Sequence, residues 1–381
     1  MNVAGLQVMF LKLVAVTLNK YMVMNASETV VRQAMFRMSQ VGKNIHIIKS
    51  IYFRIVSSKI TQIAIWLLSG LSIAIFFTSA LDMESIRAQS PTTNAGIYHF
   101  RVGQWRAMSI SDGTLSFPPS NLVPNAPSAE VAEALTSDFL PPEELSLYIN
   151  VLYLDNGDRQ ILIDTGSGTG QGAGQLIANL NSGGVTAEDI DTVIITHAHP
   201  DHIGGITKAE KLNFPNAQYY LSENEWNFWT ADSVKMPDSL LDEQTKQQMV
   251  ATAKPILQQI GDRVTRFRSG EEIIPGIQAI DVSGHTPGQS AYAITSNEDR
   301  LIVTGDIFYS DPLNLEHPEW QVGFDVDPVQ GVATRRQMLE QLESDRTLLL
   351  VPHMSFPGLG YVKAEGENYQ WQPISWQFNP S

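Results

Sequence analysis

Short, largely apolar runs that end in polar side chains recur through the second half of the chain. They occupy residues 193–195, 276–282, 301–304 and 348–351. Apolar runs of this length, bounded by turn residues, are typical of buried strands. Each run is followed within a few residues by histidine or aspartate. The pattern therefore predicts a mixed α/β (α+β) fold in which buried strands carry polar groups at their ends.

Alternating and turn-rich stretches predict the neighbouring strands. These strands are expected at residues 99–108, 109–117, 145–154, 159–163 and 214–221. Asp112-Gly113 is a hairpin signal, and residues 155–158 form a second and stronger one. The glycine-rich stretch 166–174 lacks the lysine of a phosphate-binding loop and is expected to form the flexible edge of a pocket.

Helices are expected to begin near Ile203 and to cover residues 223–230, 242–254 and 328–342. Pro255 is expected to stop or kink the third of them, because proline lacks an amide hydrogen and clashes with the preceding turn. Trp229, in the second, has two interpretations. It lines an apolar substrate pocket, or it belongs to the core.

Residues 60–81 carry no charged side chain, with basic residues before them and acidic residues after them. Their length fits a membrane span of about 20 residues, and the charge bias places the preceding flank in the cytoplasm. A cleaved signal peptide is the alternative. We therefore expect residues 1–90 to be a signal or anchor segment with a linker, and residues 91–381 to be the folded domain. The expected location is periplasmic or secreted, or anchored to the membrane by this segment.

Charge and cysteine content exclude several classes of function. The chain of 381 residues has 25 Lys and Arg against 40 Asp and Glu, a formal net charge of −15, and no cysteine. Binding to nucleic acid relies on clustered basic residues, so a nucleic acid partner is not expected. Disulfides and thiolate metal sites are excluded outright.

The most informative stretch is THAHPDHIGG at residues 196–205, directly after a predicted buried strand. It places His197, His199, Asp201 and His202 within six residues of one another. Neutral imidazoles and carboxylates are good ligands for first-row divalent metals. A tetrahedral catalytic site takes about three protein ligands, so this spacing suggests two metal ions.

Further candidate groups follow the other predicted strands. His285 lies in GHTPG, Asp306 in GD, and His353 directly after the last apolar run. Asp164 ends another apolar strand, in the sequence DTG, where a carboxylate needs a partner. It is expected either to orient a metal ligand through a hydrogen bond or to be a structural turn residue.

These motifs, in this order, resemble those of the metallo-β-lactamase-fold hydrolase superfamily. The matching motifs are HxHxDH at residues 197–202, GHTPG with His285, GD with Asp306 and the late His353. The likeness extends over residues 96–381, and FPNA at 214–217 and the tail at 353–373 look most like the branch of methyl parathion hydrolase and its lactonase relatives. The resemblance implies a four-layer αβ/βα sandwich with metals at one edge, between two sheets.

The same resemblance implies a dinuclear, metal-dependent hydrolase. One metal would be held by His197, His199 and His285, the other by Asp201, His202 and His353, with Asp306 bridging both. Zn²⁺ is the default for a histidine-rich pair, while Mn, Fe and Co fit the same ligands. A hydroxide between the metals would be the nucleophile, and Asp201 or water would transfer a proton to the leaving group.

The substrate class is less well defined by the sequence. Tyr309 lies three residues after Asp306 and resembles a tyrosine of N-acyl homoserine lactonases that contacts the substrate carbonyl or the leaving oxygen. Its alternative is an aromatic packed on the pocket rim. The loop after DTG lacks the pocket aromatic of organophosphate-hydrolysing relatives. We therefore expect hydrolysis of lactones or related carboxylic esters, with phosphotriesterase side activity.

Two alternatives stay open. One is a phosphotriester hydrolase of the methyl parathion type, and the other is a non-catalytic, metal-stabilised binding scaffold. A small molecule is the expected partner, and a membrane is expected only at the N-terminal segment. A homodimer is expected because relatives of this kind are often dimers, although the sequence names no interface.

Overall fold

A computed structural model of the protein describes residues 95–170 and 172–378. The expected signal or anchor helix and the boundary at residues 90 and 91 lie outside the described residues, so both stay predictions. In the part of the chain that is described, no helix is long and apolar enough to cross a membrane.

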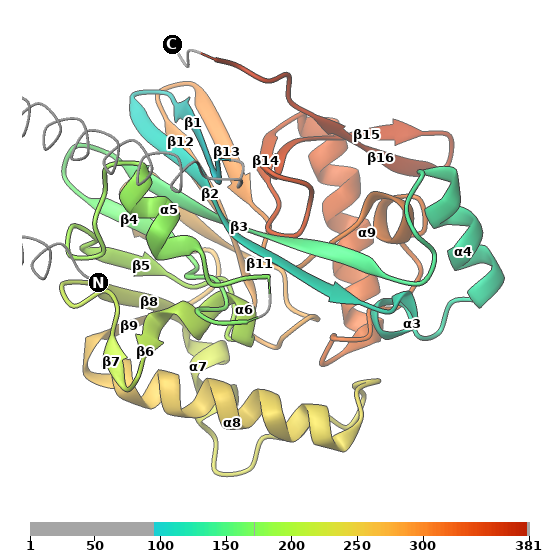
Figure 1. The fold of residues 1–381 in the computed structure, drawn as a ribbon, viewed down its shortest axis with the longest axis horizontal. Helices are drawn as coiled ribbons and strands as arrows, with labels where there is room; N and C mark the ends of the chain where they lie inside the picture. Colours follow the sequence, from blue (N-terminus) through green and yellow to red (C-terminus); the bar gives the residue numbers. More distant parts are fainter. Residues whose placement is uncertain (1–94, 171, 379–381) are drawn as a thin grey trace, which may run out of the picture. The chain divides into compact units, whose positions relative to one another are not determined.

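Within the described residues, two seven-stranded sheets form the centre of the domain (Figure 1). The first contains, in spatial order, β1 (Ile97–Val102), β2 (Trp105–Phe117), β3 (Leu145–Asp155), β4 (Gln160–Ile163), β5 (Thr192–Ile194), β8 (Gln218–Ser222) and β9 (Val264–Phe267). The second contains β10 (Glu272–Ile274), β11 (Ile277–Asp281), β12 (Ser290–Ser296), β13 (Asp299–Val303), β14 (Leu348–Leu350), β15 (Leu359–Glu365) and β16 (Asn368–Pro373). A small ribbon joins β6 (Thr207–Lys208) to β7 (Lys211–Leu212).

Helices cover the outer face of each sheet. The α-helices are α3 (Pro119–Leu122), α4 (Ser128–Ser137), α5 (Leu176–Ser182), α6 (Pro200–Ile203), α7 (Glu223–Thr230), α8 (Glu243–Ile260) and α9 (Pro328–Asp345). Short turns of other helix types are η1 (Gly204–Ile206), η2 (Gly261–Arg263) and η3 (Asp311–Leu315). In Figure 1, α5 to α8 accompany the first sheet, whereas α9 packs on the second.

Alternate residues of each central strand point into different cores. Val193 packs outward against the helices of the first sheet, while its neighbour Ile194 points between the two sheets. In the second sheet, Leu350 points between the sheets and Leu349 packs outward near α9. Strands buried on both faces need apolar residues at every position, which explains the continuous apolar runs. The four-layer αβ/βα arrangement is confirmed for the described residues.

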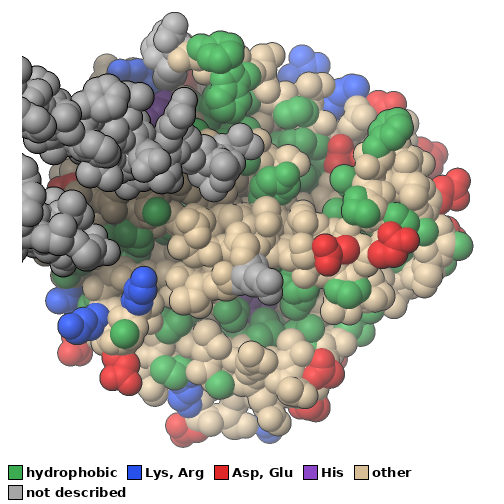
Figure 2. Space-filling view, viewed as in Figure 1, with side chains coloured by type: hydrophobic (Ala, Val, Ile, Leu, Met, Phe, Trp, Pro, Cys, Tyr) green, Lys and Arg blue, Asp and Glu red, His purple; other side chains and the backbone are tan. Residues whose placement is uncertain are grey.

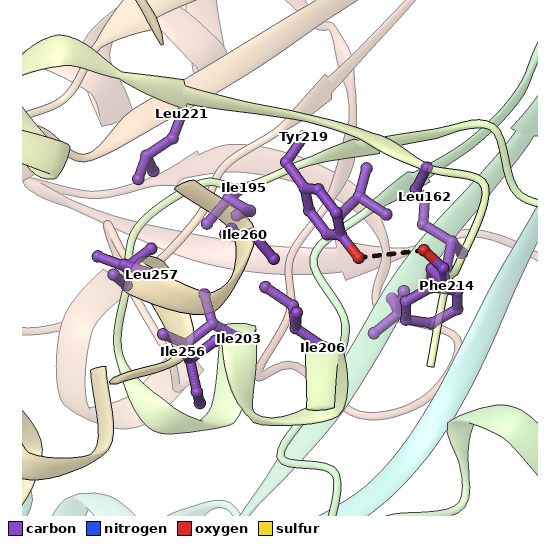
Figure 3. Close-up of a cluster of buried hydrophobic side chains, with 14 of the residues drawn as sticks. Leu162, Ile195, Ile203, Ile206, Phe214, Tyr219, Leu221, Ile256, Leu257 and Ile260 are labelled. Atoms are coloured by element: carbon purple, nitrogen blue, oxygen red, sulfur yellow. Dashed lines mark hydrogen bonds between the residues drawn. The ribbon is translucent and has the colours of Figure 1, made fainter. Parts of the chain in front are cut away.

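The outer core of the first sheet shows how the helices are held (Figure 3). Ile256, Leu257 and Ile260 of α8 pack in the same buried cluster as Ile203 and Leu221. Burying a side chain of this size contributes about 1.5–3 kcal/mol, so the three residues of α8 together stabilise the domain by several kcal/mol.

Parallel pairing brings the ends of distant strands to one edge. β4, β5 and β8 run parallel in the first sheet, and β13 and β14 run parallel in the second. Neighbouring parallel strands end at the same edge of a sheet, where sites commonly form. Asp164 follows β4, Asp306 follows β13 and His353 follows β14. Topology alone therefore gathers residues that are far apart in the sequence.

The prediction of a hairpin at Asp112-Gly113 is wrong, whereas the hairpin at residues 155–158 is confirmed. Asp112 lies inside β2, where the register against β3 shifts between Ser111 and Gly113. The buried Asp112 carboxylate accepts hydrogen bonds from the backbone nitrogens of Ser167, Gly174 and Leu176. This carboxylate thus organises the glycine-rich loop instead of forming a turn.

Two expectations about helix ends also differ from the structure. Pro255 does not stop α8, which continues to Ile260, because the burial of its last turns offsets the cost of about 3 kcal/mol for a proline inside a helix. The helix expected to begin near Ile203 is reduced to two short turns, α6 (Pro200–Ile203) and the 3-10 turn η1 (Gly204–Ile206). Gly205, in η1, has no room for a side chain, because a Cβ there would lie 1.9 Å from the carbonyl oxygen of Thr165.

Candidate metal centre

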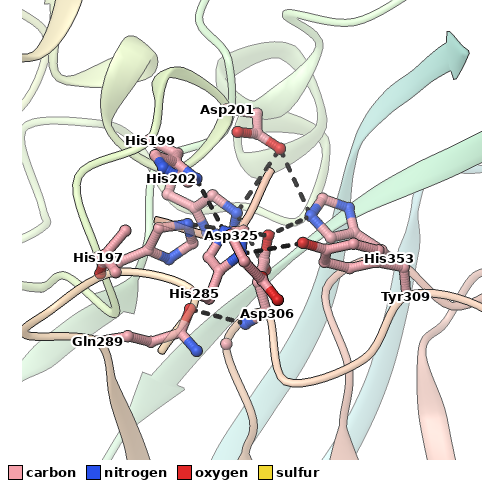
Figure 4. Close-up of polar contacts among 12 residues, drawn as sticks. His197, His199, Asp201, His202, His285, Gln289, Asp306, Tyr309, Asp325 and His353 are labelled. Atoms are coloured by element: carbon pink, nitrogen blue, oxygen red, sulfur yellow. Dashed lines mark hydrogen bonds and ion pairs between the residues drawn. The ribbon is translucent and has the colours of Figure 1, made fainter. Parts of the chain in front are cut away.

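The structure brings the seven predicted metal ligands together in two groups (Figure 4). The first group is His197, His199 and His285, and the second is Asp201, His202, Asp306 and His353. Within each group the candidate ligand atoms lie within 4.8 Å of one another. All are buried except Asp201, whose side chain is 22% exposed. The residues come from the segments that follow β5, β11, β13 and β14, and Asp201 and His202 lie in the short helix α6.

Asp306 lies between the two groups. Its Oδ2 is 3.0 Å from His353 Nε2 and 3.5 Å from His285 Nε2. Its Oδ1 is 3.2 Å from His202 Nε2. One carboxylate therefore faces ring nitrogens of both groups, which fits the bridging role that the resemblance implies. Ligation itself stays a prediction.

The donor atoms fit a pair of divalent cations. His197 Nε2, His202 Nε2 and Asp306 Oδ1 are buried and have no hydrogen-bond partner among the described residues. A buried polar atom without a partner costs about 1–3 kcal/mol, so several at one place need a common explanation. Burial lowers the pKa of His197 and of His199 well below the ordinary value. These imidazoles are neutral near pH 7, the form that binds metals.

Hydrogen bonds fix the orientation of the histidine rings from behind. Asp164 Oδ2 lies 2.8 Å from His202 Nδ1, and His353 Nδ1 lies 2.7 Å from the carbonyl oxygen of Tyr148. Such contacts select the tautomer whose other nitrogen faces the metal. Asp164 has φ of 65°, a strained value for a residue other than glycine. Its position fits the predicted orienting role.

Asp325 makes the corresponding contact to the first group, whereas the sequence indicated only a carboxylate near the start of the helix at Pro328. Its buried Oδ1 lies 2.8 Å from His285 Nδ1. The guanidinium of Arg335, buried on α9, lies 3.8 Å from its other oxygen. The sequence shows this residue only as an aspartate inside a mostly apolar stretch before α9. Without knowledge of the fold, such an aspartate cannot be distinguished from a helix-capping residue.

Tyr309 and Asp201 border the same centre. The Tyr309 hydroxyl lies 3.0 Å from His285 Nδ1, and its ring centroid is 5.4 Å from that of His353. Burial raises the pKa of Tyr309 well above its ordinary value, so the phenol keeps its proton. Asp201 is the most exposed of the seven candidate ligands. Their catalytic roles stay predictions.

The interpretation of Trp229 as a pocket residue is wrong. Its side chain is fully buried and does not border the cavity. The indole Nε1 donates a hydrogen bond to Glu225 at 2.6 Å, and the ring meets that of His199 edge to face at a centroid distance of 5.6 Å. The buried acceptor holds the indole inside the core, behind a predicted ligand.

A cavity of about 510 Å³ opens over the two groups. His199, Asp201, His285, Asp306, Tyr309 and His353 line its polar end. Most of the other lining side chains are apolar, namely Leu115, Phe117, Leu147, Met249, Ile256 and Phe324, and Thr207 and Thr252 add two hydroxyls. Figure 2 shows histidine between hydrophobic side chains near the centre of the face viewed. Ser167 and Thr169 of the glycine-rich loop form one edge, as expected.

Comparison with known proteins agrees with this geometry. The model of the metallo-beta-lactamase superfamily matches residues 146–353. AidC, a dizinc quorum-quenching lactonase solved with a product, is 28% identical with a TM-score of 0.72, over 74% of this chain and 98% of AidC. The hydrolase AbOPH of the beta lactamase superfamily is 30% identical with a TM-score of 0.69, over 75% of this chain and all of AbOPH.

A probable metal-dependent hydrolase from Staphylococcus aureus shares the fold, at 20% identity and a TM-score of 0.58, over 74% of this chain and 100% of that chain. No match is found among curated proteins. The prediction of a metal-dependent hydrolase is confirmed at the level of the family. The motifs, the two ligand groups and a family match over more than half of its length show that the chain belongs to the metallo-beta-lactamase superfamily.

Proposed function

We propose that the protein hydrolyses lactones, or closely related carboxylic esters, that carry an apolar substituent, with the help of two divalent metal ions. The observation that carries this proposal is one cavity lined by members of both ligand groups, by a protonated tyrosine and by mostly apolar walls. The 28% identity to the dizinc lactonase AidC supports both the lactone and Zn²⁺ as the first candidate metal.

The walls of the cavity suit a hydrocarbon chain. Phe117 and Phe324 meet edge to face at 5.3 Å between ring centroids, and Met249 and Ile256 of α8 also line the cavity. Removing apolar surface from water stabilises a complex by about 25 cal/mol per Å². A substrate with an aliphatic substituent therefore gains affinity from the walls, while its polar head reaches the histidines and Asp306.

The residues at the polar end have complementary roles. When bound, the metal pair supplies Lewis acidity and makes hydroxide available near neutral pH. Tyr309 donates a hydrogen bond to the substrate carbonyl or to the leaving oxygen, where negative charge develops. Asp201, the most exposed candidate ligand, would accept the proton of the attacking hydroxide and pass it to the alkoxide that ring opening releases.

A phosphotriesterase side activity is the second part of the proposal. Phe117 and Phe324 give the cavity two aromatic walls, which would also accept an aryl leaving group. The loop after Asp164 contributes Ser167 and Thr169 instead of an aromatic side chain. Because this aromatic side chain is missing, we expect a lower kcat/KM for phosphotriesters than for lactones.

Parallel assays of the full chain, purified without chelator, test this ranking. The substrates are N-hexanoyl-homoserine lactone, γ-butyrolactone, phenyl acetate and methyl parathion, with His202→Ala as the control. We expect the acyl lactone to have the highest kcat/KM, and the control to lose activity on every substrate. A preference for methyl parathion would reverse the ranking. Bound metal without turnover of any substrate would favour a binding scaffold.

A further inference from the structure

Glu225 is a buried carboxylate that the proposed chemistry does not use. It lies on α7, and its side chain is fully shielded from solvent. Burying a charged group is costly unless hydrogen bonds compensate it. Burial raises the pKa of Glu225 above its ordinary value, although nearby donors oppose this effect. A charge in this position needs a structural or functional reason.

Four donors surround the carboxylate. Oε1 accepts hydrogen bonds from the Ala198 backbone nitrogen at 2.8 Å and from Trp229 Nε1 at 2.6 Å. Oε2 accepts from Thr286 Oγ1 at 2.7 Å and from the Gly288 backbone nitrogen at 3.0 Å. An ionised carboxylate offers about four acceptor sites, and all of them are used here.

Three of the four donors belong to the two loops that carry the first ligand group, and the fourth, Trp229, lies on α7 itself. Ala198 separates His197 from His199, and Thr286 directly follows His285. The first loop leaves β5 of one sheet, and the second leaves β11 of the other. The hydrogen bonds of Glu225 therefore connect the two sheets beside the three histidines. Hydrogen bonds to a charged acceptor are about twice as strong as neutral ones.

The second group has a different support. His202 is held by Asp164, and His353 by the carbonyl oxygen of Tyr148. No hydrogen bond of Glu225 among the described residues reaches the loops of Asp306 or His353. The two groups thus rely on different carboxylates, although the Thr196 hydroxyl, which donates to Asp164 at 2.8 Å, also lies 3.1 Å from His197 Nδ1.

We infer that Glu225 is a positioning residue for one metal of the pair: it sets the spacing between the His197–His199 loop and His285, and thereby the affinity of the first group. The inference rests on the metal binding in the proposed function and is independent of the substrate. Asp164 has the corresponding role for the second group.

Zn²⁺ binding to the full chain, measured by competition with a chromogenic chelator, tests the inference. Glu225→Gln keeps the shape but turns an NH₂ group toward two donors. We expect one of the two stepwise dissociation constants to weaken by about 10–100-fold, as is typical when a partner of a ligand is lost, and the other to change by less than about threefold. Asp164→Asn is expected to weaken the other constant more strongly, because its direct contact is to His202.

Two further variants separate positioning from general stability. Glu223→Gln alters an exposed residue of the same helix, which pairs with Arg268, and should leave both constants unchanged. Thr286→Val removes a single donor without a change of shape, and should weaken the same constant as Glu225→Gln, by a few-fold. It provides the test if Glu225→Gln does not fold.

Several results would overturn the inference. The inference fails if Glu225→Gln and Thr286→Val both have the Zn²⁺ dissociation constants of the wild type. It also fails if a variant loses affinity equally at both binding steps. An effect of Asp164→Asn that is confined to the same step as that of Glu225→Gln would also contradict it. If the wild-type chain binds no Zn²⁺, the proposed function fails with it. If the wild type binds two ions but does not hydrolyse lactones, only the choice of substrate fails.

Discussion

At the scale of single residues, the candidate centre combines histidine rings with buried carboxylates placed behind them. Asp164 and Asp325 each face the Nδ1 atom of one predicted ligand, at 2.8 Å. A ring whose Nδ1 carries the proton presents the lone pair of Nε2 to a metal. Each carboxylate therefore selects one tautomer and also supplies negative charge behind a cation site.

Removal of the Tyr309 hydroxyl should slow turnover more than it weakens binding. His285 Nδ1 donates its proton to Asp325 in this arrangement. The Tyr309 hydroxyl therefore need not donate to His285, and its proton is free for a hydrogen bond to the substrate. Tyr309→Phe should lower kcat for an acyl lactone by about 10²-fold, the usual effect of losing one donor to a developing oxyanion, with little change in KM. Steady-state kinetics at matched metal content measures this. An unchanged kcat would make Tyr309 a packing residue.

Asp311, at the start of η3, should make stability depend on pH. Burial raises its pKa from 3.8 to about 6, so the folded protein binds this proton more tightly than the unfolded chain. Its contribution to stability is therefore present at low pH and falls as pH rises from about 4 to about 6. Asp311→Asn keeps an acceptor for the Trp371 amide and removes the charge.

The variant should gain about 1–2 kcal/mol over wild type across this window, a figure reduced because the carboxyl is only half-buried. Urea unfolding of both proteins at pH 4.5, 5.5 and 7, in the presence of EDTA, gives the difference. A difference that stays constant with pH would contradict the assignment.

At the scale of elements, the sequence is most informative where strands are buried on both faces. The continuous apolar runs and the polar residues that follow them could be predicted, because both follow from local residue types. The bulge that buries Asp112 and the buried carboxylate of Glu225 could not, since most of their donors lie in loops distant in the sequence. The orientation of Trp229 depends on the same contacts, because its acceptor Glu225 is local but is itself held by donors from those loops.

Replacement of Pro255 in α8 tests whether burial of the helix or its intrinsic helix propensity dominates its stability. Its side chain is exposed, so it adds little to the core, yet it removes one hydrogen bond inside the helix. Pro255→Ala should stabilise the protein by about 1–3 kcal/mol. Chemical denaturation with and without EDTA would show the same gain in both states. A loss of stability would mean that the helix is bent to fit the core and needs the proline.

At the scale of the whole molecule, each candidate metal lies at the junction of the two sheets. The first group takes His197 and His199 from the first sheet and His285 from the second, and the second group is divided in the same way. The contact between the sheets is apolar and extends through a large buried cluster. The metals are therefore expected to tighten one edge of a fold that already has its own core.

Metal removal should accordingly lower stability without unfolding the protein. A ligand present at about 1,000 times its dissociation constant stabilises the folded state by about 4 kcal/mol. For a domain of this size, this corresponds to a loss of about 10 °C in Tm after chelation. Thermal unfolding followed by circular dichroism, before and after EDTA, should show this loss and its recovery with Zn²⁺. The loss of Tm on chelation should be smaller for His202→Ala, because only the first ligand group is intact in this variant and can bind a metal. An unchanged Tm despite measured loss of both ions would mean that the histidine groups are fully organised by their hydrogen bonds, and that the metals serve chemistry alone.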